Sequence, residues 1–210
     1  MEADFLVPRQ VVLASASPSR KRLLESAGIF PTVMVSGVDE EDPALLALSP
    51  KEMVIALAIL KAHAVAPLAP KDSIVIACDS TFEFEGESLG KPLTADVAIA
   101  RAKRLRGQTG YLHTGHCIID RSSETEVTDF STSLVKFADM SDYEIDAYVA
   151  SGEPLTVAGG FTLDGLAAPF IERIDGDYTG IIGLSLPLLR RAFNTLGLRW
   201  PDIAEMVVPA

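Results

Sequence analysis

The sequence predicts an α/β fold with a mixed sheet. Segments with helical periodicity alternate with short apolar segments rich in strand-forming residues along the 210 residues. Two of the apolar segments, 111–120 and 124–137, flank a polar turn at 120–123, which is typical of an antiparallel hairpin. No repeat or long linker divides the chain, so its length fits one large domain or two intimate lobes.

The chain begins with a strand, a serine-rich turn and a helix. Val11-Val12-Leu13-Ala14 is a short apolar segment typical of a buried strand. Ser17 suits a helix N-cap and Pro18 the first helical position, and Gly28 can end the helix.

A second helix begins at the capping-box pair Ser49 and Glu52. Apolar residues then recur at helical intervals and predict one buried face, formed by Met53, Leu57, Leu60 and Ala64. Further helices are expected at about 94–106, 141–152 and 187–196, and strands near 31–36, 73–85, 111–120 and 124–137.

Composition limits the location and the partners. The chain is 48% hydrophobic and 22% charged, and its net charge is −11. The negative net charge argues against nonspecific nucleic-acid binding, which needs a basic face. It still allows a small anionic ligand where a few Lys and Arg side chains and a divalent metal converge. No apolar run reaches about 18 residues, so no membrane helix is expected. Met1-Glu2-Ala3-Asp4 is acidic and does not resemble a signal peptide, so we expect a cytoplasmic protein.

The two cysteines, Cys78 and Cys117, both lie in apolar segments. They are too few for a disulfide framework, and we expect small buried side chains. A zinc site is not expected, because the chain has three histidines and no Cys-x-x-Cys pair.

A candidate anion site occupies the segment 15–20. Hydroxyls at a strand end, next to free N–H groups at a helix start, form a cradle for an anion. Arg20 lies one turn into the helix, where its guanidinium could fork onto phosphate oxygens. An ordinary capped helix with a surface arginine remains the alternative.

Candidate metal ligands are acidic. Asp79 ends the apolar run 74–78, where a carboxylate is costly unless it is paired, hydrogen-bonded or bound to a metal. One carboxylate from the acidic run 39–42 would complete a Mg²⁺ or Mn²⁺ site with it. The alternatives are a turn aspartate and a solvated loop.

Two lysines could offset phosphate charge together with Arg20. Lys61 interrupts the apolar segment 54–66, and Lys91 lies between Gly90 and Pro92, which fix its backbone. Each by itself could equally be a surface residue.

In their order along the chain, these segments resemble the Maf family over nearly its whole length. The motifs that carry the resemblance are Leu13-Ala14-Ser15-Ala16-Ser17-Pro18-x-Arg20, Val38-Asp39-Glu40, Leu57-Ala58-x-x-Lys61-Ala62, Asp79, Gly90-Lys91-Pro92, Leu105-x-Gly107-Gln108-Thr109, Tyr148-Val149-x-Ser151-Gly152-Glu153-Pro154, Ala158-Gly159-Gly160-Phe161 and Ile182-Gly183-Leu184.

The resemblance implies a strongly curved mixed sheet and two lobes with a deep nucleotide groove between them. It also implies hydrolysis of nucleoside triphosphates between the α- and β-phosphates, to a monophosphate and pyrophosphate. The family uses a divalent metal, usually Mg²⁺ or Mn²⁺, and commonly forms a homodimer. Its members were first noticed as inhibitors of septum formation.

The family's site residues carry over position by position. Asp79 falls on the essential aspartate and is expected to bind the metal, activate the attacking water, or both. The positively charged side chains would stabilise charge on the reacting phosphate. The other positions are Ser15, Ser17 and Arg20 for phosphate, Glu40 for metal, and Lys61 and Lys91 for the two lysines.

The departures from the family pattern concern the base. Many members of the family have Arg where this chain has Ser19. Members that prefer thymidine and uridine nucleotides often have Thr at the position of Ser80, Gln at that of Asp164 and Lys at that of Val157. An acidic residue at 164 resembles the branch that acts on 7-methyl-GTP, because a carboxylate can accept two hydrogen bonds from guanine. The base preference stays open, leaning slightly away from a strict dTTP/UTP enzyme.

Two alternative interpretations lie outside this enzyme class. A nucleotide-binding regulator of cell division would not need the full set Glu40, Asp79, Lys61 and Lys91, which this chain retains. A P-loop enzyme would need a Gly-x-x-x-x-Gly-Lys-Ser/Thr motif, which is absent from the sequence. We interpret His113 and His116, where the wider family varies, as structural.

Overall fold

A seven-stranded mixed sheet forms the centre of the computed structural model, which describes residues 9–206. The strand order is β2-β1-β3-β5-β6-β7, and β4 also pairs with β3. The parallel strands are β1 (Val11–Leu13), β2 (Thr32–Val33) and β3 (Ile74–Phe84). The strands that add in antiparallel direction are β4 (Glu87–Leu89), β5 (Thr109–Asp120), β6 (Thr125–Phe137) and β7 (Ile171–Asp175). The predicted mixed sheet and the hairpin at 120–123 are confirmed.

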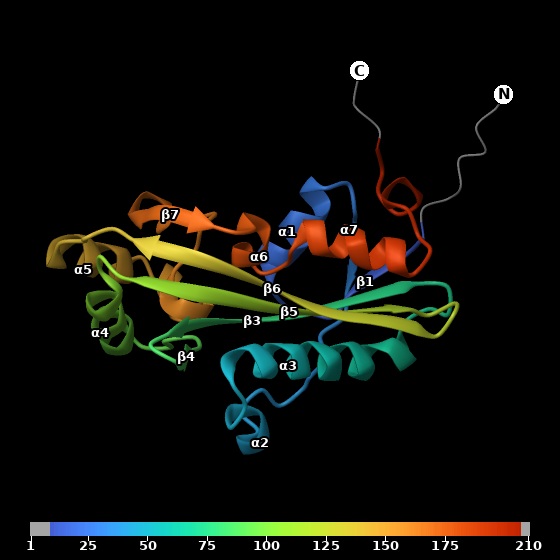
Figure 1. The fold of residues 1–210 in the computed structure, drawn as a ribbon, viewed down its shortest axis with the longest axis horizontal. Coiled ribbons are helices and arrows are strands. Elements are labelled where there is room, and N and C mark those ends of the chain that lie inside the picture. The colour runs from blue at the N-terminus through green and yellow to red at the C-terminus, as the bar shows by residue number, and fades with distance from the viewer. Residues whose placement is uncertain (1–8, 207–210) are drawn as a thin grey trace.

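Helices cover both faces of this sheet (Figure 1). On one face lies α3 (Pro50–Val65), with the short α2 (Pro43–Leu46) beyond it, and on the other lie α1 (Pro18–Ser26), α6 (Tyr178–Ile182) and α7 (Leu186–Thr195). At the end of the sheet near β4 and β7, α4 (Ala95–Leu105) packs against α5 (Asp142–Ala150). Single 3₁₀ turns occupy Ala66–Leu68, Glu153–Thr156, Ala158–Gly160, Ala168–Phe170 and Trp200–Asp202.

The rotation of α3 about its axis is the feature that matters most for the site. Its capping box forms as predicted, with Ser49 and Glu52 bonding each other's backbone. The predicted buried face was partly wrong, because Leu60 is 44% exposed and Ala64 is also exposed. The helix instead buries the rows that contain Ala58, Ala62 and Val65 against the sheet, and this rotation carries Lys61 inward.

The largest core regions lie toward opposite ends of the sheet. One surrounds β1, between α1 and α7 on one face and α3 on the other. The second is centred on Phe82, Phe137 and Phe161, whose rings meet edge to face with centroids 5.0–5.6 Å apart. Because β3, β5 and β6 run through both regions, the two ends share one continuous hydrogen-bonded support.

Several sequence-based expectations need correction. The strand expected at 31–36 is only Thr32–Val33, the part that pairs with β1. Asp79 is not at the end of a strand, since β3 continues to Phe84. The elements β4, β7, α2 and α6 were not predicted, because segments of three to five residues carry no periodic signal. The acidic segment Met1–Asp4 lies outside the described residues. Within residues 9–206, no helix is long and apolar enough to cross a membrane.

Candidate active site

The candidate site lies where one edge of β3 is open. β1 accompanies β3 only as far as Ile76, whose carbonyl accepts from the Ala14 N–H at 2.8 Å, and β4 joins only at Phe82. Among the described strands, residues 77–81 therefore have no partner on this edge. Because side chains alternate along a strand, Asp79 points to the α3 face and Ser80 to the α1 face.

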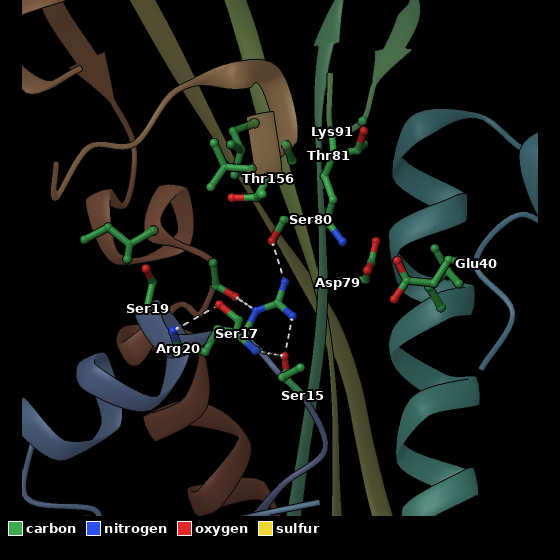
Figure 2. A pocket seen from close by; sticks show the side chains of 18 of the residues that line it. Ser15, Ser17, Ser19, Arg20, Glu40, Asp79, Ser80, Thr81, Lys91 and Thr156 are labelled. Atoms are coloured by element: carbon green, nitrogen blue, oxygen red, sulfur yellow. Dashed lines mark hydrogen bonds between the residues drawn. The ribbon is translucent and has the colours of Figure 1, made fainter. Parts of the chain in front are cut away.

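A cleft of about 1040 Å³ opens at this gap in the sheet (Figure 2). Its walls come from the end of β1, the start of α1, the loop after β2, α3, the segment after β4 and the loop 156–164. The fold thus brings together all the residues predicted for the site from the sequence, namely Ser15, Ser17, Arg20, Glu40, Lys61, Asp79, Ser80, Lys91 and Asp164.

On the α3 side of the cleft, two carboxylates converge on one ammonium group. Lys61 Nζ donates to Asp79 Oδ1 at 2.6 Å and lies 2.6 Å from Glu40 Oε1. Lys61 and Asp79 are 6% and 8% exposed, so the alternative of a surface lysine is wrong. Burial opposes the charged form of Glu40, but the hydrogen bond and charge of Lys61 outweigh it and lower the pKa of this carboxyl.

Lys91 supplies a second positive charge to the same part of the cleft. It is exposed and follows β4 and Gly90. Figure 2 shows its side chain extending from the β4 side toward Asp79. Its charge, with that of Arg20, adds to the effect that lowers the pKa of Glu40.

On the α1 side, Arg20 is buried in a network of protein acceptors (Figure 2). Its Nε donates to the Gly183 carbonyl at 2.8 Å, and Nη1 donates to the Cys78 carbonyl at 2.7 Å and to Ser15 Oγ at 3.0 Å. Nη2 donates to Ser80 Oγ at 3.1 Å. A guanidinium has five N–H groups, so one remains for a ligand. A bidentate grip on phosphate, as the sequence suggested, would require part of this network to open.

The hydroxyls around Arg20 fix one another. Thr114 donates to the Gly180 carbonyl at 2.8 Å, so the hydrogen bond of 2.9 Å between Ser80 and Thr114 uses the Ser80 proton. Ser17 caps α1 by accepting from the Arg20 N–H at 3.4 Å, and its own N–H donates to Ser15 Oγ at 3.2 Å. The amino end of α1 therefore faces the cleft with its first turn already ordered, an arrangement suited to an anion.

Comparison with known proteins assigns the family. The family model described as "Maf-like protein" matches residues 10–196. The chain belongs to the Maf-like family. A Streptomyces coelicolor relative, named "Nucleoside triphosphate pyrophosphatase", is 51% identical over 203 residues and covers 96% of each chain. A relative with the same name from Synechococcus sp. is 52% identical over 186 residues, which are 86% of this chain and 96% of that one. A solved structure of a nucleoside-triphosphatase, dITP/XTP pyrophosphatase, from Mycobacterium abscessus covers 89% of this chain and 94% of its own. Its TM-score is 0.40 at 13% identity, too low to support a conclusion.

In this Maf-like chain, Asp164 lies on the far wall of the cleft, in the segment 161–166. Its Oδ2 accepts from Arg22 Nη2 of α1 at 3.2 Å, so the contact joins two walls of the cleft. The segment is held by Glu153, whose carboxylate accepts from the Leu166 N–H at 3.0 Å and from the Thr162 hydroxyl. Asp164 is therefore presented from a fixed turn.

Sequence reasoning gave no role to Glu153, Thr114 or Gly183. Glu153 and Gly183 lie in segments that resemble the family, 151–154 and 182–184, and this resemblance is the sequence signal that could have identified them. At Gly183 the backbone has φ +125°, which disfavours other residues, and an added Cβ would lie 3.2 Å from Arg20 Nε. A strand threonine such as Thr114 gives no comparable signal.

The three histidines and the two cysteines lie outside the cleft. Protein contacts hold the two histidines interpreted as structural, His113 and His116, although Nδ1 of His116 has no hydrogen-bond partner among the described residues. His116 Nε2 accepts from the Ser185 N–H at 2.8 Å, and burial lowers the pKa of this imidazole to about 3, which keeps it neutral. His113 is hydrogen-bonded to Glu83 and to a threonine on β6, each at 2.8 Å. The prediction that Cys78 and Cys117 are buried is confirmed, since both are 0% exposed.

Proposed function

We propose that the cleft binds a nucleoside triphosphate with a divalent metal and hydrolyses the bond between its α- and β-phosphates, releasing a monophosphate and pyrophosphate. The general class, a nucleoside triphosphate pyrophosphatase acting on a phosphate anhydride, follows from the family and from relatives about 50% identical over nearly the whole chain. The observation that supports the mechanism best is the buried pair Asp79–Lys61 with the partly exposed Glu40 on the same ammonium group, toward which Lys91 extends.

Asp79 and Glu40 fit a hard divalent cation. Both offer carboxylate oxygens, the donors that Mg²⁺ and Mn²⁺ prefer, and both oxygens lie 2.6 Å from the same nitrogen and so converge on one region. These two residues would hold the metal. A bound cation there lowers the pKa of a coordinated water and offsets the charge of the phosphates.

Side chains and backbone groups of the cleft would position the attacking water and bind the phosphates. Lys61 holds Asp79 Oδ1, which leaves the second oxygen of Asp79 to accept a proton from the attacking water. The water oxygen forms a bond to phosphorus as the bond between that phosphorus and the bridging oxygen breaks. Lys91 is free to contact the oxygens on which charge develops, and the first turn of α1 binds the phosphates.

Base recognition is assigned to the wall that carries Asp164. In this proposal Asp164 can accept hydrogen bonds from the edge of a base, while Arg22 holds the orientation of its carboxylate. Ser80 acts through Arg20 rather than on the base, because its proton is given to Thr114. A purine with two neighbouring donors, as in guanine or its 7-methyl derivative, matches a carboxylate better than uracil or thymine does.

The finer expectations from the resemblance belong to the same proposal. We expect the protein to be a cytoplasmic homodimer. Each subunit would be a single domain with two lobes, and the enzyme would remove noncanonical or modified nucleotides. Sedimentation of the purified protein tests the dimer.

The function is tested with a panel of canonical and modified nucleoside triphosphates in Mn²⁺, Mg²⁺ or EDTA, with pyrophosphate and orthophosphate measured separately. We expect metal-dependent pyrophosphate release that is lost in Asp79→Ala. The matched control, Asp39→Asn, changes an exposed carboxylate of the same acidic run and should keep wild-type rates. Asp164→Gln should change the order of preferred bases. Nucleotide binding without turnover on any substrate would contradict the proposal and favour a regulator of septum formation.

A further inference from the structure

Outside the cleft, three metal-binding side chains from three elements meet on the sheet face that α3 covers. They are His63 in the last turn of α3, Cys117 on β5 and Glu126 on β6. One ligand atom from each lies within 4.8 Å of the other two. His63 Nε2 and Glu126 Oε2 are already 2.6 Å apart.

The β5–β6 register fixes this arrangement. Cys117 is opposite Thr128 and Ile119 is opposite Glu126, so Cys117 and Glu126 are diagonal neighbours on the same face. α3 packs along these strands, and its last turn brings His63 over them. Positions 63, 117 and 126 form no recognisable sequence motif. The absence of a Cys-x-x-Cys pair therefore does not exclude a zinc site made of these three residues.

We propose that His63, Cys117 and Glu126 form a site for Zn²⁺ or a similar borderline cation, with a water molecule as the fourth ligand. Zinc accepts nitrogen, sulfur and carboxylate ligands in tetrahedral geometry. A thiolate ligand selects against Mg²⁺ and Mn²⁺. This chemistry differs from that of Asp79 and Glu40, which offer oxygen alone and suit the harder cations.

The geometry needs only a small adjustment. With bonds of about 2.0–2.3 Å to the metal, tetrahedral ligands lie roughly 3.3–3.8 Å apart, against at most 4.8 Å here. Cys117 is 0% exposed and fixed on its strand. The side chains of His63 and Glu126 are 56% and 44% exposed, so they can close over the metal and leave the fourth position open to water.

The surroundings of Cys117 act on its thiolate in two opposite directions. Burial raises the pKa of this thiol to about 11, so without a metal it carries its proton at neutral pH. A hydrogen bond from Thr128 acts in the opposite direction by stabilising the thiolate. A metal takes the place of the thiol proton, and Thr128 then orients the ligand as an outer partner.

Such a site would fasten the end of α3 to the β5–β6 hairpin. His63 lies two residues after Lys61, whose ammonium holds Asp79 in the cleft. A cation on His63, Cys117 and Glu126 would therefore stabilise the helix that supplies the lysine without entering the cleft.

Cobalt titration of the full chain tests the proposal, because Co²⁺ bound to a thiolate gives a charge-transfer absorption that a site with only oxygen ligands cannot give. In the wild type, we expect the band to saturate at one equivalent of Co²⁺ and to disappear when Zn²⁺ displaces the cobalt. His63→Ala and Glu126→Gln, which change exposed side chains, should each weaken binding at least tenfold. Cys117→Ser should abolish the band.

Glu124→Gln is the matched control, since it alters an exposed carboxylate of the same hairpin that lies outside the cluster. It should bind cobalt as the wild type does. The proposal is overturned if the folded wild type shows no such band, or if the band is unchanged in both His63→Ala and Glu126→Gln.

Discussion

Replacing Lys61 by methionine removes the ammonium between Asp79 and Glu40 and keeps most of the apolar stem. Both carboxylate oxygens lie 2.6 Å from Nζ, so they are no more than about 5 Å apart. At an effective dielectric constant near 20, two such charges repel by about 3 kcal/mol. Glu40 can turn toward water, since its side chain is 44% exposed, but that of Asp79 is 12% exposed and stays buried. Leaving a buried charge unpaired costs about 3–5 kcal/mol. We expect a net loss of about 3 kcal/mol.

Thermal unfolding in EDTA measures this loss, which corresponds to roughly 6–12 °C for a chain of this size. Adding Asp79→Asn to Lys61→Met should recover at least about 1 kcal/mol, because the stranded charge is then gone. Mn²⁺ should stabilise Lys61→Met more than the wild type. Lys71→Met, at an exposed lysine, serves as the control. The reasoning fails if Lys61→Met unfolds within about 0.5 kcal/mol of the wild type, or if the two substitutions are additive.

Three further predictions follow from contacts around the cleft and at the sheet end. The hydrogen bond from Arg9 holds the pKa of Asp120 below its usual value, so the pair stabilises the fold above about pH 4 and loses this contribution as the pH falls further. The free energy of unfolding, measured with denaturant from pH 7 to 3, should therefore decrease less steeply for Asp120→Asn than for the wild type. Equal slopes would contradict this. Gly115→Ala should cost about 2–3 kcal/mol in denaturant unfolding, because its Cβ would collide with the Val54 carbonyl of α3; an unchanged midpoint would argue against such close packing. Arg20→Lys cannot remake the planar network, so kcat/KM should fall at least about tenfold, and near wild-type kinetics would show that the network is dispensable.

The sequence was sufficient to predict the longer elements and the members of the site. Capping boxes and helical periodicity gave α3, α4 and α5 close to their observed bounds, and the polar turn at 120–123 gave the β5–β6 hairpin. The resemblance selected the side chains that line the cleft. These are local patterns, which a sequence carries directly.

What could not be predicted depends on contacts between distant segments. Asp79 was expected at a strand end, but its exposure to the cleft arises because β1 stops and β4 has not begun. The inward direction of Lys61 depends on a small rotation of α3 that apolar spacing alone did not fix. The acceptors of Arg20 come from three separate parts of the chain, and the His63–Cys117–Glu126 cluster depends on strand register.

The site is tested most directly by identifying the products with phosphorus NMR, for the wild type, Asp79→Asn and Glu40→Gln on the best nucleotide. The proposed function predicts monophosphate and pyrophosphate from the wild type, formed only with a divalent metal. We expect rates at least about a hundredfold lower in Asp79→Asn, because the group that accepts the proton and binds the metal is gone. A diphosphate with orthophosphate, or undiminished turnover in EDTA or in Asp79→Asn, would contradict the proposed role of the cleft.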